Sequence, residues 1–538
     1  MSQKAEMETI KILLVNPAAI QNYWSLKHSS DFNGSAGLMP SLALTTLAAL
    51  TPDPESLRAN VEFTIVDEVD KPVDVDADCD IVGFTGYVNQ ISRMHELAAI
   101  FKAKGRLVII GGPHPSLAPH RYRDYCDVLF TGEAEETWPR FLHDYVAGDF
   151  EDEYQAAPQV DITTSPVPRY DLIDPDRYWV GSVQTSRGCP FECEFCDVIV
   201  YLGRRQRHKT GEQLSNELDA LYARGFRDVF LCDDNLTAHR GRAVAVLEAV
   251  RDWRMRQDEP VRFITQVSID VARPQDQDLL DLCYDAGLRT AFVGIETTNE
   301  ASLIGAKKRQ NTRSNEGTMV EKVQRIHQRG IQVQAGLIAG FDQDDMSCFQ
   351  MLFDFAQQAG IPGLAITQLN APEATPLAAR MAAEGRLLPA TAMIAESGAN
   401  FASNILPAQM TNEELSRGVT WLYNRLYHPD TFLERIEGLA AHLPDADSER
   451  GAAYGTTDMK RAVPMFTNMQ RLLRQEGQGS MARTVLRQMR TKEINHVVFA
   501  LTLYYNTIKL LDHWGIYDPN PPERFDPERP VTINRTSA

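Results

Sequence analysis

The sequence lacks the features of several protein classes. It has no uninterrupted apolar run of the roughly 18–20 residues that a membrane span needs, and its first residues lack the apolar core of a secretory signal. Its eight cysteines are too sparse for a disulfide framework in 538 residues. Its 54 Lys and Arg stand against 73 Asp and Glu, and the net charge of -19 repels nucleic acid. We therefore expect a cytoplasmic protein without a transmembrane segment or a nucleic-acid partner.

The first part of the chain alternates short apolar runs with helical patterns. Apolar runs that end in glycine and precede a helix are typical of a doubly wound parallel sheet. The expected strands are 10–15, 63–67, 80–86, 107–112 and 127–132, and the expected helices are 41–50, 90–103 and 133–146. Such sheets bind ligands at the carboxyl ends of their strands. We predict a Rossmann-like binding domain over residues 8–150 and a linker over 151–180.

A second alternating series follows the linker. Its expected strands are 182–186, 228–232, 262–268, 290–295, 333–339 and 364–369, and its expected helices are 211–223, 240–253, 275–286, 315–329 and 346–359. Six such units predict a complete or partial β/α barrel of the TIM type over residues 181–400, with its active face at the carboxyl ends of the strands. A mainly helical region over 401–515 and an extended, proline-rich tail over 516–538 complete this α/β prediction.

Three cysteines stand directly after the first strand of the second series, in the sequence TSRGCPFECEFCD. Cys189, Cys193 and Cys196 have the spacing CxxxCxxC, and no further Cys or Cys/His pair nearby could complete a tetrahedral zinc site. Three thiolates fit a [4Fe-4S] cluster whose fourth iron stays open for another ligand. The other five cysteines are scattered in apolar stretches and are interpreted as small core residues.

This loop, with the aromatic Phe195 before its last cysteine, resembles that of the radical S-adenosylmethionine (SAM) superfamily. The resemblance implies that the open iron chelates SAM, and that an external donor of the flavodoxin or ferredoxin type supplies one electron. The resulting 5′-deoxyadenosyl radical would remove hydrogen from an unactivated carbon. The candidate SAM-binding residues are Phe195, Asp233, Asp234, Asn235, Gln266, Ser268, Glu296 and Gly340. Structural alternatives are a helix cap and turn for 233–235, an ion pair for Glu296, and an ordinary turn for Gly340.

A doubly wound domain before such a barrel resembles the cobalamin-binding subclass of the family. Small residues at strand ends permit the close approach of a corrin ring, and no GxGxxG motif follows the first strand to indicate a dinucleotide. The candidate cobalamin-binding residues are Thr85, Gly86, Tyr87, Gly111, Gly112, Pro113, Gly132 and Glu133. None of the 12 histidines stands in an Asp-x-His-x-x-Gly motif, so we expect no histidine ligand to cobalt and interpret His114 as a loop residue.

The layout is similar to the branch that contains hopanoid C-methylases. This similarity implies a C-methyltransferase that carries a methyl group through methylcobalamin to a carbon radical of a small molecule or lipid. One alternative is a cyclisation, rearrangement or oxidation with the same cofactors, and another is a sensor whose cluster catalyses nothing. The basic run 203–209 fits either an anion-binding segment or a solvated loop, and the segment 305–311 matches no chemistry that the sequence explains.

Overall fold

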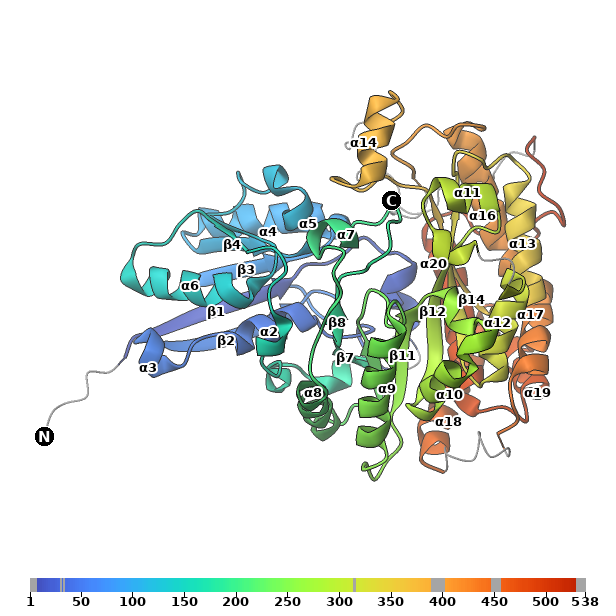
Figure 1. Cartoon of the computed structure of the whole chain (residues 1–538), viewed down its shortest axis with the longest axis horizontal. Coiled ribbons are helices and arrows are strands. Elements are labelled where there is room, and N and C mark those ends of the chain that lie inside the picture. The colour runs from blue at the N-terminus through green and yellow to red at the C-terminus, as the bar shows by residue number, and fades with distance from the viewer. Residues whose placement is uncertain are drawn as a thin grey trace, which may run out of the picture. The chain divides into compact units, whose positions relative to one another are not determined.

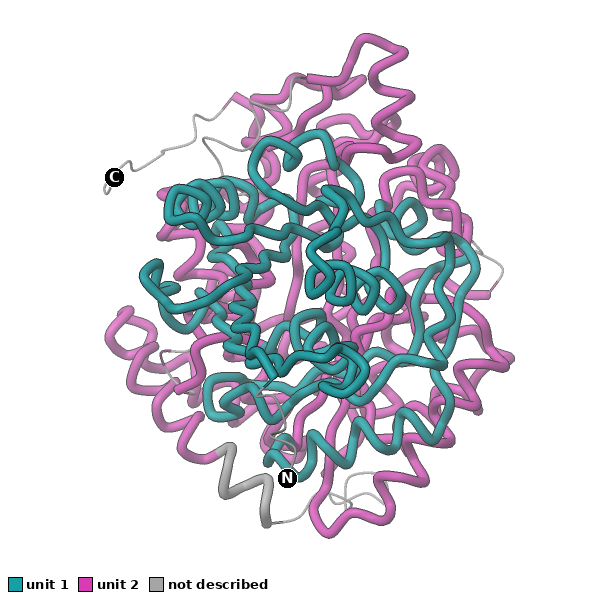
Figure 2. Tube along the Cα trace, turned by 90° about the vertical axis from the view of Figure 1, so that its left-hand side faces the viewer, with its two compact units in different colours: residues 1–20, 39–190, 197–226 teal, residues 21–38, 191–196, 227–538 magenta. Residues whose placement is uncertain are grey.

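The computed structural model describes residues 7–29, 31, 34–312, 316–388, 402–446 and 456–528, with the backbone alone for 456–462. The chain divides into two compact units, coloured separately in Figure 2. Unit 1 comprises residues 1–20, 39–190 and 197–226, and unit 2 comprises residues 21–38, 191–196 and 227–538. Cys189 therefore belongs to unit 1, whereas Cys193 and Cys196 belong to unit 2.

The main sheet of unit 1 is parallel, with the strand order β2-β1-β3-β4-β5-β6. Its strands are β1 (Thr9–Asn16), β2 (Asn60–Asp67), β3 (Ile81–Thr85), β4 (Leu107–Gly111), β5 (Val128–Thr131) and β6 (Glu153–Gln155). The helices around it are α2 (Leu42–Ala49), α3 (Pro54–Leu57), α4 (Ile91–Ala103), α5 (Pro113–Leu117) and α6 (Ala134–Ala147). Figure 1 shows α4 and α6 on opposite sides of the strands. This arrangement confirms the doubly wound fold, and β6 adds a strand within the segment predicted to be a linker.

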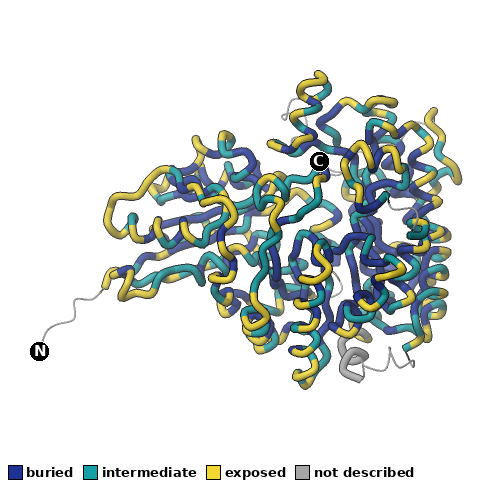
Figure 3. Tube along the Cα trace, viewed as in Figure 1, coloured by how far each residue is buried: buried dark blue, intermediate teal, exposed yellow. Residues whose placement is uncertain are grey.

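The apolar runs of this sheet are buried because helices cover both of its faces. Trp138 and Phe141 of α6 pack onto Ile12 and Ile109 of the strands, and all four side chains are at most 3% exposed. Figure 3 shows buried residues gathered along the central strands of this unit. The side chains that remain open to ligands lie at the ends of the strands.

Unit 1 continues beyond this sheet into the residues that flank the cysteine loop, residues 185–197. Its further elements are β7 (Gly181–Val183), β8 (Ser186–Arg187), α7 (Val198–Tyr201), β9 (Arg207–His208) and α8 (Gly211–Ala223). Strands β8 and β9 pair in antiparallel fashion, with Arg187 opposite Arg207. The cysteine loop therefore begins from a two-stranded ribbon within the same unit as the Rossmann-like sheet.

The sheet of unit 2 is also parallel, with the order β14-β13-β12-β11-β10. Its strands are β10 (Asp228–Leu231), β11 (Arg262–Val267), β12 (Leu288–Glu296), β13 (Gln332–Ala339) and β14 (Gly363–Gln368). The helices that alternate with them are α9 (Arg240–Arg254), α10 (Gln277–Asp285), α11 (Glu300–Gly305), α12 (Met319–Gln328) and α13 (Cys348–Ala359). The parallel strands bring their carboxyl ends to one edge, as the predicted barrel requires.

The C-terminal helices protect an edge of this sheet. They are α14 (Pro376–Ala383), α16 (Asn412–Leu426), α17 (Pro429–His442), α18 (Thr456–Gln475), α19 (Met481–Gln488) and α20 (Ile494–His513). The Tyr423 hydroxyl accepts from the Ile366 amide at 2.9 Å and donates to the Ile366 carbonyl at 2.8 Å. The Tyr427 hydroxyl accepts from the Leu364 amide at 3.0 Å. These bonds satisfy backbone groups that an edge strand would otherwise expose to pairing.

The end of the described chain lies against the C-terminal helices without regular secondary structure. Residues 516–528 contain no helix or strand, and the Trp421 indole donates to the Pro522 carbonyl at 2.9 Å. No helix in the described ranges is long and apolar enough to cross a membrane. The predicted boundary near residue 400 and the last ten residues of the predicted tail lie outside the described residues.

Candidate functional site

The cysteine loop carries three free thiols that differ in exposure. Cys193 is buried, whereas Cys189 and Cys196 are half-buried. The Cys189 amide donates to the Gly203 carbonyl at 3.2 Å, and the Cys196 amide donates to the Cys193 carbonyl at 3.1 Å. The backbone bonds thus restrain the loop on both sides of its turn.

The donor set suits an iron–sulfur cluster better than a single ion. Within the described ranges, no group of three or more His, Cys, Asp or Glu side chains is placed to hold one metal ion. In a [4Fe-4S] cluster each thiolate binds a different iron, so the sulfurs need not converge on one point. Cysteines elsewhere have pKa values raised by burial, to about 11 for Cys126 and about 12 for Cys283. Those thiols stay protonated, as expected of core residues.

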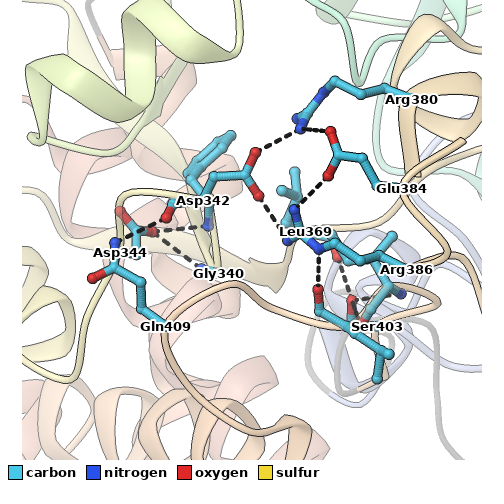
Figure 4. A network of polar contacts seen from close by, with 12 residues as sticks. Gly340, Asp342, Asp344, Leu369, Arg380, Glu384, Arg386, Ser403 and Gln409 are labelled. Carbon is cyan, nitrogen blue, oxygen red and sulfur yellow. Dashed lines mark hydrogen bonds and ion pairs between the residues drawn. The ribbon is translucent and has the colours of Figure 1, made fainter.

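Glu194, inside the cysteine loop, is held by three separate contacts. Its amide donates to the Ala306 carbonyl at 3.1 Å, and its carbonyl accepts from the Leu377 amide at 2.9 Å. Its carboxylate accepts a hydrogen bond from the Arg380 guanidinium at 2.6 Å. Arg380 also donates to Asp342 at 2.6 Å, and Figure 4 shows this bond within a larger polar network. Sequence reasoning missed Arg380 because the contact spans 186 residues.

A half-buried lysine, Lys308, faces the same part of the loop. The Lys308 ammonium donates to Glu296 at 2.6 Å and lies 6.0 Å from the centre of the Phe195 ring. Burial alone would lower the pKa of Lys308, but Glu296 and the sulfur of Cys193 raise it above its usual range. Lys308 therefore carries a positive charge near the sulfur atom of Cys193.

The segment 305–311 thus has a place that its sequence did not indicate. Besides Lys308, it contributes Gln310, whose amide donates to the Cys193 sulfur at 3.6 Å. The side-chain amide group of Asn311 donates to the backbone carbonyls of Gly294 and Ile295, each at 3.0 Å. Glu296 itself has a φ of 64°, a strained value for a residue other than glycine. The signal in the sequence was a lysine, a glutamine and an asparagine within four positions, which no local pattern connects to the cysteines.

The structure joins two of the predicted SAM-binding residues at the ends of β10 and β11. The side-chain amide group of Asn235 donates to the Ser268 hydroxyl, and the Thr237 hydroxyl donates to the side-chain oxygen of Asn235 at 3.4 Å. The Leu236 amide donates to the Gln266 carbonyl at 3.0 Å, which ties the two strand ends together. The neighbouring acids are less uniform: Asp233 is buried, whereas Asp234 is half-buried.

Gly340 and Phe195 lie in the same neighbourhood of unit 2. Gly340 has a φ of 103°, and a Cβ there would lie 2.9 Å from Leu415, so the chain itself requires glycine. The buried Asp344 accepts the Gly340 and Phe341 amides, each at 3.1 Å. The Phe341 ring lies edge-on to Phe195 at 6.1 Å between ring centres.

The strand ends of unit 1 are built from small residues and exposed apolar ones. Gly112 has a φ of 115°, and a Cβ there would lie 2.4 Å from the Thr85 hydroxyl. A Cβ at Gly86 would lie 2.8 Å from Gln90, and one at Gly132 would lie 2.8 Å from Ala156. A larger residue would be strained at Gly112 and Gly132, which have a positive φ, whereas at Gly86 it would displace the flexible Gln90 side chain. Gly111 ends β4, and Pro113 begins α5 directly after Gly112.

Two large side chains after β3 are left open to solvent. Tyr87 is 59% exposed and Val88 is 42% exposed, at the strand end where such sheets bind ligands. Adjacent exposed apolar side chains are suited to covering the face of a flat ring. His114, by contrast, is buried, and its Nδ1 is 2.7 Å from the Tyr122 hydroxyl. This position agrees with a structural role for His114.

Glu133, a predicted cobalamin contact, is engaged by two arginines. Its carboxylate lies 2.7 Å from Arg187 and 2.5 Å from Arg207. Glu135 lies 2.7 Å from Arg187. Burial raises the pKa of the Glu135 carboxyl, but Arg187, the Glu135 amide and the Ser165 hydroxyl together outweigh this effect, and the net pKa is lowered.

Comparisons with known proteins cover nearly the whole chain. Residues 183–356 match the radical SAM superfamily, residues 35–142 match the B12 binding domain, and residues 375–507 match a domain of unknown function, DUF4070. The chain is 34% identical to the uncharacterized methyltransferase sll1242 of Synechocystis, over 79% of this chain and 78% of that protein. It is 29% identical to the hopanoid C-2 methylase of Rhodopseudomonas palustris, over 85% of each chain.

The fold also resembles a solved structure. The cobalamin-dependent SAM radical enzyme OxsB, with aqua-cobalamin and SAM bound, superposes with a TM-score of 0.61 at 15% identity. The similarity covers 94% of this chain and 80% of that one. Both matched domains, the identity to sll1242 and the three-cysteine loop lead to one assignment. The chain belongs to the radical SAM enzymes with a B12-binding domain, whose cofactors are a [4Fe-4S] cluster, SAM and cobalamin.

Proposed function

We propose that this enzyme transfers a methyl group from SAM to a carbon atom of a small-molecule or lipid substrate. The observation that carries the proposal is that this chain matches both cofactor domains and is similar over most of its length to relatives named as methyltransferases, one of them a C-methylase. When bound, the cofactors supply reductive cleavage of SAM and transfer of its methyl group to carbon, which no side chain could perform. The protein's part is to bind, orient and shield the reactants.

The proposed residues for the cluster are Cys189, Cys193 and Cys196. Gln310 donates to the Cys193 sulfur, and Lys308 places a positive charge near the same sulfur. Both features stabilise a reduced, more negative cluster, because hydrogen bonds and nearby charge raise the reduction potential. An external donor of the flavodoxin or ferredoxin type would supply the electron.

The proposed SAM contacts divide by chemistry. Hydrogen-bonding side chains would hold the polar methionine and ribose groups, and the backbone around Gly340 would face the adenine. The polar residues are Asp233, Asp234, Asn235, Gln266, Ser268 and Glu296. Phe195 packs edge-on against Phe341 and would form an apolar wall beside the cluster. The Glu296–Lys308 pair limits Glu296 to hydrogen bonds that its second oxygen can accept.

The proposed cobalamin contacts come from the ends of β3, β4 and β5. The residues are Thr85, Gly86, Tyr87, Gly111, Gly112, Pro113 and Gly132. The exposed Tyr87 would cover part of the ring, while the glycines allow its close approach. We propose no histidine ligand to cobalt, and the Nδ1 atom of the nearby His114 already contacts the Tyr122 hydroxyl.

The decisive experiment uses SAM with a deuterated methyl group. The reconstituted enzyme would be incubated anaerobically with cobalamin, a reductant and fractionated metabolite and lipid extracts. We expect S-adenosylhomocysteine and 5′-deoxyadenosine together, and a product that gains three deuterons. A product formed with 5′-deoxyadenosine but without S-adenosylhomocysteine would instead establish a cyclisation, rearrangement or oxidation. Cobalamin and iron binding without any SAM cleavage would indicate a sensor.

A further inference from the structure

A compact group of four charged side chains joins the sheet of unit 1 to the start of the cysteine loop. This carboxylate–arginine cluster consists of Glu133, Glu135, Arg187 and Arg207, whose side chains are 4–14% exposed. Glu133 precedes α6, directly after the candidate cobalamin-binding Gly132. Arg187 stands two residues before Cys189. The cluster therefore connects residues assigned to two different cofactors.

The two carboxylates neutralise a repulsion between the two arginines. Arg187 and Arg207 are directly opposite each other in the β8–β9 ribbon, where like charges repel. Glu133 reaches both, with one oxygen 2.7 Å from Arg187 and the other 2.5 Å from Arg207. Glu135 adds a second carboxylate to Arg187 at 2.7 Å. Two positive and two negative charges thus balance in a buried place, as buried ions require.

Further bonds fix the direction of the arginines. Arg187 donates to the Gln184 side chain at 2.7 Å, and Arg207 donates to the Val160 carbonyl at 2.7 Å and to the Leu202 carbonyl at 3.2 Å. Ser165 donates to Glu135 at 3.0 Å. Each charged side chain therefore has a defined orientation set by more than one partner.

The restraint reaches Cys189 through the backbone. Gly188 has a φ of 91°, and a Cβ there would lie 2.9 Å from the carbonyl oxygens of both Gly203 and Arg205. The Cys189 amide donates to the same Gly203 carbonyl. The ribbon thus leaves little freedom between Arg187 and the first cysteine, so a shift of the ribbon would move Cys189.

We propose that Glu133 and Glu135 are positioning residues for the iron–sulfur cluster, which act by holding the β8–β9 ribbon that carries Cys189. Both oxygens of Glu133 are committed to arginines, so this role replaces its predicted contact with cobalamin. The helix that follows a cobalamin-binding strand then helps to place a cysteine of the cluster. This inference rests on the three-cysteine site and is independent of whether the enzyme transfers methyl.

The test compares two glutamates at the start of α6, the N-cap residue Glu133 and the first-turn residue Glu136, in the full-length, reconstituted protein. Glu133→Gln removes the charge between the arginines, whereas Glu136→Gln removes an exposed carboxylate three residues away. We would measure iron content, the electron paramagnetic resonance spectrum of the reduced cluster with and without SAM, and cobalamin retained after desalting. For Glu133→Gln we expect at least a two-fold loss of cluster signal or an altered spectrum, with cobalamin retention unchanged. Glu136→Gln should match the wild type.

A second variant separates positioning from simple destabilisation. Glu133→Gln combined with Arg207→Gln removes one charge of each sign and leaves the Arg187–Glu135 pair. We expect this variant to fold, with a Tm close to that of the wild type and an altered cluster spectrum. Wild-type spectra in both variants would overturn the proposal, even if the Tm fell. Loss of cobalamin with an unchanged cluster would restore Glu133 to the cobalamin site.

Discussion

The carboxyl ends of the two parallel sheets carry different types of residue. In unit 1, β3 and β4 end in the small residues Thr85–Gly86 and Gly111–Gly112, and a large exposed residue, Tyr87, stands beside them. In unit 2, β10 and β12 lead into Asn235 and Glu296, whose side chains have specific polar partners. A broad, flat ligand needs accessible backbone, whereas a small zwitterion needs directed hydrogen bonds. The same strand topology thus presents two different sets of side chains at its edge, and these suit the two ligand chemistries proposed above.

The largest expected effect lies at Cys193, in the part of the cysteine loop that belongs to unit 2. Cys193→Ala should abolish cluster absorption near ~400 nm and all SAM cleavage, because three thiolates are the smallest scaffold for this site. Cobalamin retention should persist, since the ends of β3 to β5 are untouched. Cys79→Ala, at a buried cysteine of unit 1, is the control and should keep the cluster. SAM cleavage by the Cys193 variant would reject the radical SAM site as assigned.

Removing the half-buried Lys308 tests how far unit 2 depends on charge. Lys308→Met would leave Glu296 buried without its partner, which should cost about 3–5 kcal/mol in the free energy of unfolding. Lys307→Met, at the exposed neighbour, should cost little. The double variant Lys308→Met/Glu296→Gln should recover most of the loss in chemical denaturation. Additive losses in the double variant would show that the two side chains are not coupled.

The corresponding test in unit 1 concerns the backbone conformation of a glycine, Gly112, rather than a charged pair. Gly112→Ala should destabilise the protein by about 3 kcal/mol and weaken cobalamin retention, because it adds a strained φ and a close contact to Thr85. Gly105→Ala shares a positive φ of 73° but has nothing within 4 Å of the new Cβ. It should therefore show only the strain, with cobalamin retention unchanged. Equal cobalamin loss in both variants would remove the link between Gly112 and the ligand.

The stability of unit 2 should depend on pH through its buried histidine His327. Burial lowers the pKa of His327 to about 3 from an ordinary 6.5, with further lowering by His442 and His496. Between these values the unfolded chain binds more protons than the folded one, so stability falls as the pH falls. The loss from pH 7 to pH 5 should approach about 2 kcal/mol. The Tm of His327→Gln should depend less on pH than that of the wild type. An unchanged pH dependence of the Tm would show that His327 is not the cause.

Periodicity and composition predicted the fold because they report on local burial. The run 10–15 became β1 with one residue added at each end, and the prediction 107–112 became β4 over Leu107–Gly111. β6 escaped notice because it has only three residues, one of them buried. The predicted helical region over 401–515 did not show the break between α19 and α20 at residues 489–493, because helix formers continue through it.

The sequence by itself determined the three-cysteine loop and the glycine-ended strands, because both are contiguous patterns whose chemistry depends on spacing alone. Only the tertiary structure decided which partner each charged residue takes. Glu133 meets Arg207 across 74 residues, Glu194 meets Arg380 across 186, and no local pattern encodes either pair. The pairing of Glu296 with Lys308 likewise required the segment after α11 to fold back on β12. Buried charges take the partners that packing brings within reach, and packing is a property of the whole chain.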